Sequence, residues 1–398
     1  MSRAGSTRRL VGLVTGWQTV ASSCYYAPFA AVPFLSEAFG LSRFLVGVLV
    51  MTLTLGYTLA LVPSGALVDA YGERPAFVGG LAGLGGAALA VTAAPSTALL
   101  FVATFALGGA YATAMPATNR AIVAGAPADR QGVAIGLKQV GVTGGSALAA
   151  LVVATAAPAV ATWRAGLAGL GVLALAVAGL FAVGYTGSPA AGGPTLPDLG
   201  SLRDNRAYLT LVTAGLCLGA GLFTAVGYLT LYLTEAVGTT VAVAGGGFAL
   251  AQVAGSVGRV GVGGVADHLS RRLSWAPVRA ATLLLAGQAG VGVVLLAALA
   301  RSPPPAVALV LVAGVGLSVF GFTGLYYTAL SALVHDREVG AATAGGQTAL
   351  NVGALLAPPG FGLLADTASY GRSWLALAAV VAVGVALVAL TYARLPNI

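Results

Sequence analysis

Long apolar stretches dominate this chain, and each is about as long as a membrane is thick. The hydrocarbon core of a bilayer is about 30 Å thick, so a helix needs about 20 apolar residues to cross it. Only 8% of the residues are charged, whereas a soluble domain carries about 25%. The sequence therefore predicts an all-α polytopic membrane protein. We expect twelve transmembrane helices, at residues 10–35, 44–67, 75–93, 97–120, 132–157, 163–186, 207–234, 241–263, 276–300, 305–331, 340–364 and 373–394.

One polar segment interrupts this pattern near the middle of the chain. Residues 186–206 contain three prolines, four glycines and several charged residues, a composition typical of a linker. We therefore expect an N-terminal six-helix half at residues 1–187, a cytoplasmic linker at 188–206 and a C-terminal six-helix half at 207–398.

The two halves repeat each other in sequence. Asp69 follows the second span within the stretch Gly65 to Arg74, and Asp267 follows the eighth span in a similar stretch with Gly263 and Arg271. A second repeat pairs two residues of the fifth span with two of the eleventh at a constant offset of 208, namely Gly132 with Gly340 and Gln139 with Gln347. An internal repeat of this kind predicts two pseudo-symmetric halves and is typical of secondary transporters.

Basic residues indicate how the chain is oriented. With the N-terminus inside, fourteen of the nineteen Lys and Arg residues fall on the cytoplasmic side, four fall outside and one, Lys138, lies within a span. Positive residues favour the cytoplasmic side of short loops, so both termini are expected to be cytoplasmic in the cell membrane. The net charge of +8 is explained by this bias beside anionic lipid headgroups, and it predicts no nucleic-acid partner.

The stretch Gly65 to Arg74 resembles G-x-x-x-D-x-x-G-x-[RK], the signature of the major facilitator superfamily (MFS) between its second and third spans. The second copy has Ser270 where the signature has glycine. Two further stretches, Asp129 to Gly141 and Pro358 to Asp366, resemble the branch that contains anion, cyanate and nitrate-like permeases.

The resemblance implies an alternating-access secondary transporter that works as a monomer, with no cofactor and no enzymatic activity. It also implies a gating role at the ends of the spans, and the alternative for each charged residue is an ordinary solvated loop charge. The implied gating residues are Gly65, Asp69, Gly72, Arg74, Arg130, Asp267 and Arg271.

Two departures from the family pattern bear on the substrate. Proton-coupled drug exporters of the superfamily carry an arginine in the fourth span, where this chain, aligned on Gly108, has Ala103 and Thr104. They also carry Gly-Pro in the fifth span, where this chain has Gly141 followed by Val142. Both differences argue against drug–proton antiport.

Lys138 is the only lysine in the chain, and it lies about six residues into the fifth span. All eleven acidic residues and both histidines fall at span ends or in loops, so the side chains that commonly relay protons are missing from the spans. A lysine at the centre of a helix costs about 2.5–3.5 kcal/mol on insertion, which makes Lys138 a functional hypothesis. The alternative is that its ammonium group reaches back to the interface. An embedded cation without an acidic partner favours an anionic solute.

Other polar and aromatic residues lie within the predicted spans, and for each the alternative is packing or hydrogen bonding between helices. We expect a transporter of a small organic or inorganic anion; an exporter of drugs or neutral metabolites and a non-transporting membrane sensor are the alternatives. The sequence has no metal-ligand spacing. The candidate substrate-binding residues are Lys138, Gln139, Arg120, Tyr26, Tyr111, Gln252, Arg259, Gln347 and Asn351.

Overall fold

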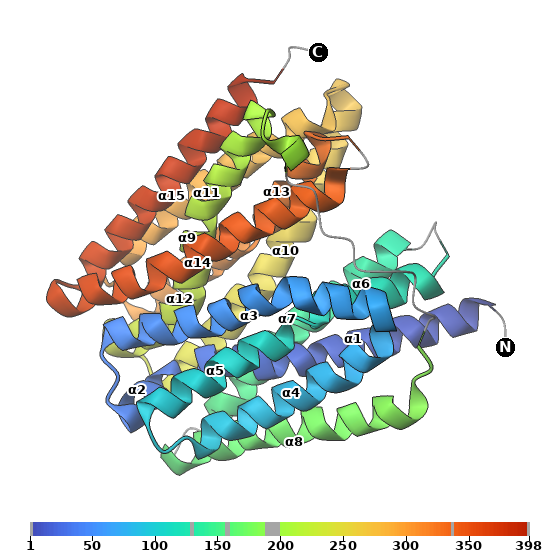
Figure 1. Cartoon of the computed structure of the whole chain (residues 1–398). Helices are drawn as coiled ribbons and strands as arrows, with labels where there is room; N and C mark the ends of the chain where they lie inside the picture. The colour runs from blue at the N-terminus through green and yellow to red at the C-terminus, as the bar shows by residue number, and fades with distance from the viewer. Residues whose placement is uncertain (1–2, 128–130, 156–159, 188–199, 336–337, 396–398) are drawn as a thin grey trace. The chain divides into compact units, whose positions relative to one another are not determined.

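The structure, a computed structural model, describes residues 3–127, 131–155, 160–187, 200–335 and 338–395. Regular structure in these ranges is helical (Figure 1). Arg130 and residues 188–199 of the expected linker lie outside the described residues.

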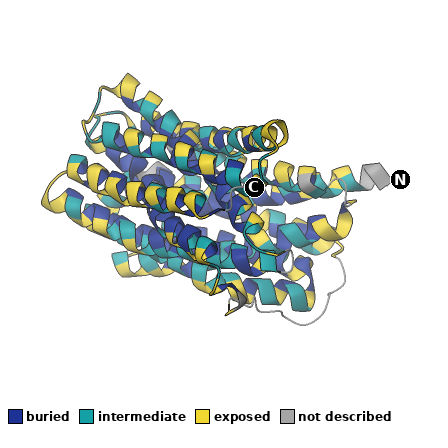
Figure 2. Ribbon diagram, turned by 90° about the horizontal axis from the view of Figure 1, so that it is seen from above, coloured by how far each residue is buried: buried dark blue, intermediate teal, exposed yellow. Residues whose placement is uncertain are grey.

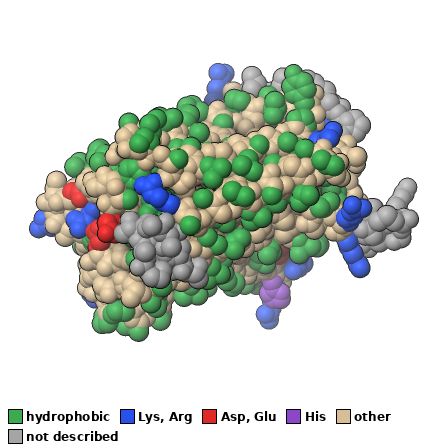
Figure 3. Space-filling model, turned by 90° about the horizontal axis from the view of Figure 1, so that it is seen from below, with side chains coloured by type: hydrophobic (Ala, Val, Ile, Leu, Met, Phe, Trp, Pro, Cys, Tyr) green, Lys and Arg blue, Asp and Glu red, His purple; other side chains and the backbone are tan. Residues whose placement is uncertain are grey.

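Eleven helices within the described ranges are long and apolar enough to cross a membrane. The twelfth expected span corresponds to α1 (Arg3–Ala30), whose 28 residues include Thr15, Gln18 and Ser22 and are less apolar than the others. Large apolar side chains such as Val183, 91% exposed, point away from the protein. Most helices are buried on one side and exposed on the other (Figure 2), and hydrophobic side chains are spread over the face drawn in Figure 3. The prediction of an all-α polytopic membrane protein is confirmed.

The described chain groups into two compact units. The first unit comprises residues 1–40 and 52–196. Within it, α1 packs on α7 and α4 packs on α8, and Trp17 Nε1 donates a hydrogen bond to the Phe77 carbonyl oxygen at 3.0 Å. Its helices are α1, α2 (Val32–Phe39), most of α3 (Arg43–Tyr71), α4 (Glu73–Ala93), α5 (Thr97–Tyr111), α6 (Ala114–Gly125), α7 (Gln131–Thr155) and α8 (Val160–Gly184).

The second unit comprises residues 41–51 and 197–398, so it includes the first turns of α3. Within it, α9 packs against α14 and α15, and α11 packs against α15. Its other helices are the short η2 (Gly200–Leu202), α9 (Arg206–Glu235), α10 (Val241–Leu273), α11 (Pro277–Leu299), α12 (Pro305–Val315), the π-helical turn η3 (Gly316–Phe320), α13 (Thr323–Ala332), α14 (Val339–Thr367) and α15 (Tyr370–Ala393).

Three of the expected spans are divided into shorter helices. The fourth is broken between α5 and α6, where Pro116 has no N–H to bond the Ala112 carbonyl and so disrupts the helix one turn earlier. The tenth is divided by the π-turn η3 and the turn that follows it. The first is divided at Ala31, because Pro33 occupies the first turn of α2, where proline is tolerated.

The sequence repeat extends to the contacts inside each unit. A Cβ added to Gly108 on α5 would lie 1.9 Å from the Leu53 carbonyl oxygen on α3. A Cβ added to Gly316 on η3 would lie 2.2 Å from the Ala251 carbonyl oxygen on α10. The two glycines are 208 residues apart, like Gln139 and Gln347, and the two carbonyls are 198 apart, like the two signature aspartates. Helix backbones therefore approach each other closely at matching positions of both units.

A second pair of contacts follows the same rule. A Cβ added to Gly145 on α7 would lie 2.3 Å from the Thr19 carbonyl oxygen on α1. A Cβ added to Gly353 on α14 would lie 2.0 Å from the Leu216 carbonyl oxygen on α9. These glycines are again 208 residues apart. The helices that carry Lys138 and Gln347 are thus held at matched depth against α1 and α9.

Candidate functional site

Lys138 of α7 is buried, with 1% of the residue exposed. Its Nζ donates to Asn119 Oδ1 of α6 at 2.9 Å and lies 3.9 Å from Met115 Sδ. Within the residues that the structure describes, no carboxylate pairs with Lys138. The amine therefore sits among neutral groups inside the first unit.

A polar cluster on α1 and α5 lies beside α7, close to the turn that follows Lys138. Gln18 Nε2 donates to Ser22 Oγ at 3.0 Å and to Tyr111 Oη at 3.2 Å, and Ser22 Oγ and Tyr111 Oη are 3.0 Å apart. Gly141, one helical turn beyond Lys138, lets α7 approach, because a Cβ there would lie 3.0 Å from Gln18 Cβ. The Lys138 contact and the Gln18 cluster are therefore neighbours along α7.

Four tyrosines extend this lining, and we call them the tyrosine cluster: Tyr25, Tyr26, Tyr57 and Tyr111. Tyr25 stacks on Tyr111 with ring centroids 4.1 Å apart and packs edge-on against Tyr26 at 5.2 Å. Tyr57 of α3 lies 6.0 Å from Tyr111. Tyr25 is buried, whereas the other three are half-buried. The tyrosine cluster thus contains the predicted residues Tyr26 and Tyr111, and Gln18 connects Tyr111 to α7 one turn beyond Lys138.

The sequence interpretation missed Asn119. It is an amide in an apolar stretch next to Arg120, and an amide oxygen is the neutral acceptor that a buried ammonium group needs. Gln139, the neighbour of Lys138 on α7, is half-buried.

The second unit holds a related polar chain on α13 and α14. Tyr327 Oη donates to Gln347 Oε1 at 2.5 Å, and Gln347 Nε2 donates to Asn351 Oδ1 at 2.8 Å. Asn351 is 1% exposed, and its Nδ2 has no hydrogen-bond partner among the described residues. Tyr327, which sequence reasoning missed, stands 208 residues after Asn119. Each unit therefore has a polar contact that starts from the same repeat position, although Gln347 corresponds to Gln139 and not to Lys138.

Gln252 and Arg259 lie on α10. Gln252 Nε2 is buried without a hydrogen-bond partner in the described part of the chain. Arg259 Nη2 donates to the Phe320 carbonyl oxygen at 3.4 Å. Arg259 thus contacts the π-turn η3, and the hydrogen bonds of Gln347 and Asn351 are formed with other residues.

The first signature copy forms a network of charges. Arg120 Nε lies 3.3 Å from Glu73 Oε2, and Arg120 Nη1 lies 3.9 Å from Asp69 Oδ1. Glu73 is fully buried and accepts a hydrogen bond from Tyr185 Oη at 3.1 Å. Arg74 Nη2 donates to the Ala182 carbonyl oxygen at 2.6 Å.

Arg120, a predicted substrate-binding residue, therefore lies among predicted gating residues. Sequence reasoning missed Glu73, whose place inside the signature looked like a loop position.

The glycines of the signature have different surroundings. Gly72 begins α4 with φ of 81°, a left-handed conformation that favours glycine. Gly65 has open space where a Cβ would stand. In the second copy α10 continues to Leu273, and the left-handed residue is Ser274, with φ of 53°. Ser270 replaces the expected glycine because the helix has not yet ended there.

Asp267 and Arg271 line a cavity of about 220 Å³ together with Thr328. Within the described residues they form no ion pair. Thr328 stands 208 residues after Arg120, and Arg271 stands 198 after Glu73. The ion pair between Arg120 and Glu73 thus has no counterpart in the second unit, because threonine and arginine stand at the equivalent positions.

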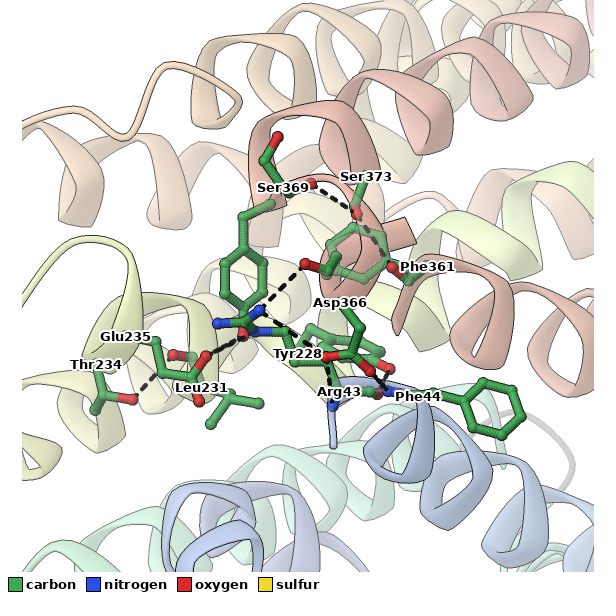
Figure 4. Close-up of polar contacts among 12 residues, drawn as sticks. Arg43, Phe44, Tyr228, Leu231, Thr234, Glu235, Phe361, Asp366, Ser369 and Ser373 are labelled. Atoms are coloured by element: carbon green, nitrogen blue, oxygen red, sulfur yellow. Dashed lines mark hydrogen bonds and ion pairs between the residues drawn. The ribbon is translucent and has the colours of Figure 1, made fainter. Parts of the chain in front are cut away.

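A further cluster centres on Arg43, at the start of α3 within the second unit (Figure 4). Arg43 Nε lies 2.9 Å from Glu235 Oε2, and its guanidinium carbon lies 4.7 Å from the centre of the Tyr370 ring. Asp366 accepts from the backbone N–H groups of Arg43 and Phe44 at 3.1 and 2.8 Å.

Asp366 therefore acts as a cap for the first turn of α3, where a carboxylate also opposes the helix dipole favourably. Tyr228 Oη donates to the Arg43 carbonyl oxygen at 2.5 Å. In the sequence analysis Arg43 is only one of the four basic residues expected outside the membrane, and nothing there connects it with Glu235 or Asp366. No group of three or more His, Cys, Asp and Glu within the described ranges is placed to hold a metal ion.

Comparisons with known proteins agree with this geometry. A family profile described as Major Facilitator Superfamily matches residues 17–288. An uncharacterised MFS-type transporter of Mycobacterium tuberculosis (strain ATCC 25618 / H37Rv) is 28% identical over 86% of this chain and 76% of its own length.

Solved structures share the fold at low identity. The inward-facing, occupied form of a bacterial homologue of the human lysosomal transporter Spinster has a TM-score of 0.79 and 14% identity, covering 98% of this chain and 97% of that one. A mutant of the nucleoside transporter NupG has a TM-score of 0.78 and 12% identity, covering 96% and 99%. A mutant of the E. coli fucose:proton symporter FucP has a TM-score of 0.62 and 16% identity, covering 97% and 99%.

Proposed function

This chain belongs to the major facilitator superfamily, and from that premise we propose that it transports a small organic or inorganic anion across the cell membrane by alternating access. The solute is the partner, the working unit is a monomer, and both termini are cytoplasmic. The observation that carries the proposal is the buried amine of Lys138, whose contacts are an amide oxygen and a thioether.

Electrostatics favour an anion at this position. A buried charge is stabilised by pairing, and attraction between opposite charges strengthens as the surroundings exclude water. Asn119 satisfies one donor of Lys138 but leaves its charge uncompensated. A carboxylate or inorganic anion brings the missing charge and additional acceptors, and a charge-assisted hydrogen bond is about twice as strong as a neutral one.

The second unit supports the same class of solute through its unused donors. Asn351 Nδ2 and Gln252 Nε2 are buried amide nitrogens without partners among the described residues. An unpaired buried donor is costly, so a solute rich in acceptor oxygens suits both. Gln347 is hydrogen-bonded to both Tyr327 and Asn351 and so holds the Asn351 side chain in place.

Gating is the second part of the proposal. Asp69 and Arg74 of the first signature act at the cytoplasmic ends of α3 and α4, with Gly65 and Gly72 shaping the turn, and Asp267 and Arg271 act in the second copy. Arg120 joins this group through its contacts with Asp69 and Glu73. These ion pairs form or break as the transporter changes state.

A neutral metabolite is the alternative solute, and the tyrosine cluster is the observation that favours it. Tyrosine rings offer apolar faces together with hydroxyl groups, which suit uncharged molecules as well as anions. Under this alternative, the Lys138 side chain contributes only to packing, and transport does not need its charge.

Uptake by the purified protein in liposomes distinguishes the two. The solutes are acetate, benzoate, nitrate, cyanate and the neutral benzamide. The variants are Lys138→Gln, Lys138→Arg and Asn119→Asp, the last of which places a carboxylate beside the Lys138 amine without changing the shape of the side chain.

We expect saturable uptake of at least one anion, lost in Lys138→Gln and Asn119→Asp and retained in part by Lys138→Arg. Flux confined to benzamide, or anion flux that Lys138→Gln and Asn119→Asp leave at the level of the unmodified protein, would contradict the proposal.

A further inference from the structure

The arrangement around Lys138 narrows the class of anion. We propose that the solute is an aromatic carboxylate, with its carboxylate at Lys138 and its ring against the tyrosine cluster. This inference rests on the proposed function and adds a second recognition element to it.

The charged end is accessible from the side of α6. Asn119 is half-buried and Met115 is 40% exposed, so the groups that cover the Lys138 amine are themselves within reach of a solute. A carboxylate that displaces the Asn119 oxygen replaces a neutral acceptor by a charged one and frees the amide to donate to the second carboxylate oxygen. Recognition at this end therefore selects for negative charge.

The part of the site that would contact the ring of the solute is formed by the tyrosine cluster. Tyr26, Tyr57 and Tyr111 come from three different helices, and each is half-buried. The buried Tyr25 stacks on Tyr111 and fixes the orientation of its ring. Aromatic pairs prefer offset or edge-on arrangements with centroids about 4.5–7 Å apart. The pairs Tyr25–Tyr26, Tyr25–Tyr57 and Tyr57–Tyr111 lie within that range, and Tyr25 and Tyr111 are stacked more closely, at 4.1 Å. An aromatic solute extends the same packing.

The two ends are joined by a short series of contacts. Gly141, one turn beyond Lys138 on α7, lies against Gln18, and Gln18 donates to Tyr111 of the tyrosine cluster. A solute that reaches from Lys138 to the cluster needs both a charged group and an apolar body, which an inorganic anion lacks. Gln18 and Ser22, bonded to Tyr111, offer polar contacts to ring substituents.

Binding to the purified full-length protein, measured by isothermal titration, tests this inference with four probes. Benzoate and cyclohexanecarboxylate share size and charge and differ in aromaticity, whereas benzamide keeps the ring without the charge, and acetate keeps the charge without the ring. The variants are Tyr57→Leu and its control Tyr71→Leu, which removes a tyrosine from the same helix at a position that is 68% exposed. Thermal unfolding of each variant checks that it is folded.

We expect benzoate to bind more tightly than the other three probes. Tyr57→Leu is expected to weaken benzoate about 2- to 12-fold, the usual range for one aromatic pair, and to leave acetate unchanged, while Tyr71→Leu changes neither. Equal binding of benzoate, cyclohexanecarboxylate and acetate, lost in Lys138→Gln, would overturn this inference and leave the anion proposal standing. Binding of benzamide as tight as benzoate, unchanged in Lys138→Gln, would overturn both.

Discussion

The contact between Gly108 on α5 and the Leu53 carbonyl on α3 gives a quantitative prediction. In Gly108→Ala the new Cβ would lie 1.9 Å from that oxygen, whereas real Cβ contacts essentially never fall below 3.0 Å. The two helices must therefore separate by about 1 Å, and overpacking of this kind costs about 1–3 kcal/mol. Alanine offsets part of this because it is a better helix former than glycine by about 0.5–1 kcal/mol. At the middle of both ranges, the net loss is expected to be about 1 kcal/mol.

Gly109, the next residue, provides the matched control. A Cβ there would have its nearest neighbour at 3.7 Å, an ordinary contact. Gly109→Ala should therefore gain the helix-propensity term without the clash, and its stability should equal or exceed that of the unmodified protein.

The two free cysteines make the measurement specific to each unit. Cys24 lies in the first unit and Cys217 in the second, and both are buried, so a thiol-reactive dye labels each when its surroundings unfold. In a background that retains only Cys24, Gly108→Ala should lower the midpoint of labelling by roughly 2–4 °C, at about 2–4 °C per kcal/mol for a unit of this size. Equal midpoints for Gly108→Ala and Gly109→Ala would refute the reasoning, because the contact would then carry no strain.

Two further predictions concern the charged clusters. Asp366→Ala removes the cap of α3 and should lower the stability of the second unit by about 1 kcal/mol, measured by labelling in a background that retains only Cys217. Asp204→Ala in the same unit, where the carboxylate is 92% exposed, should have no effect; a loss equal in both would contradict the capping role. Glu73→Gln removes the carboxylate that lies closest to Arg120, whereas Asp69→Asn removes one that is 45% exposed. An exposed ion pair contributes about 0–1 kcal/mol to stability, so Glu73→Gln should lower the unfolding midpoint of the first unit more than Asp69→Asn. The reverse order of midpoints would contradict this prediction.

The positions of the helices were predictable because the length of an apolar stretch is a local property of sequence. Each expected span corresponds to a helix or to consecutive helices, and the deviations have local causes such as Pro116 or the glycines around η3. A proline acts on the carbonyl four residues before it, so the break before α6 was in principle readable from the sequence. The π-turn had no comparable signal.

The candidate site was predictable only in part. Lys138 stood out because a lone charge within an apolar stretch is rare, but its partner Asn119 is one of many neutral polar residues. Arg43 and its partners are further apart still, since Glu235 and Asp366 follow it by 192 and 323 residues. Such a cluster depends on how α3, α9 and α14 pack, and no pattern within any one of them encodes it.

The repeated contacts of Gly108 and Gly316 also have a consequence for how freely the sequence can diverge. In each contact one helix must supply glycine, but its partner supplies a backbone carbonyl, which every amino acid possesses. The partner positions are accordingly occupied by different residues, Leu53 and Ala251. In such an interface, only the glycine position restricts which amino acid can be present, and the partner position does not. Two copies of an ancestral half can then drift apart at most positions while their helices continue to cross at the same depth.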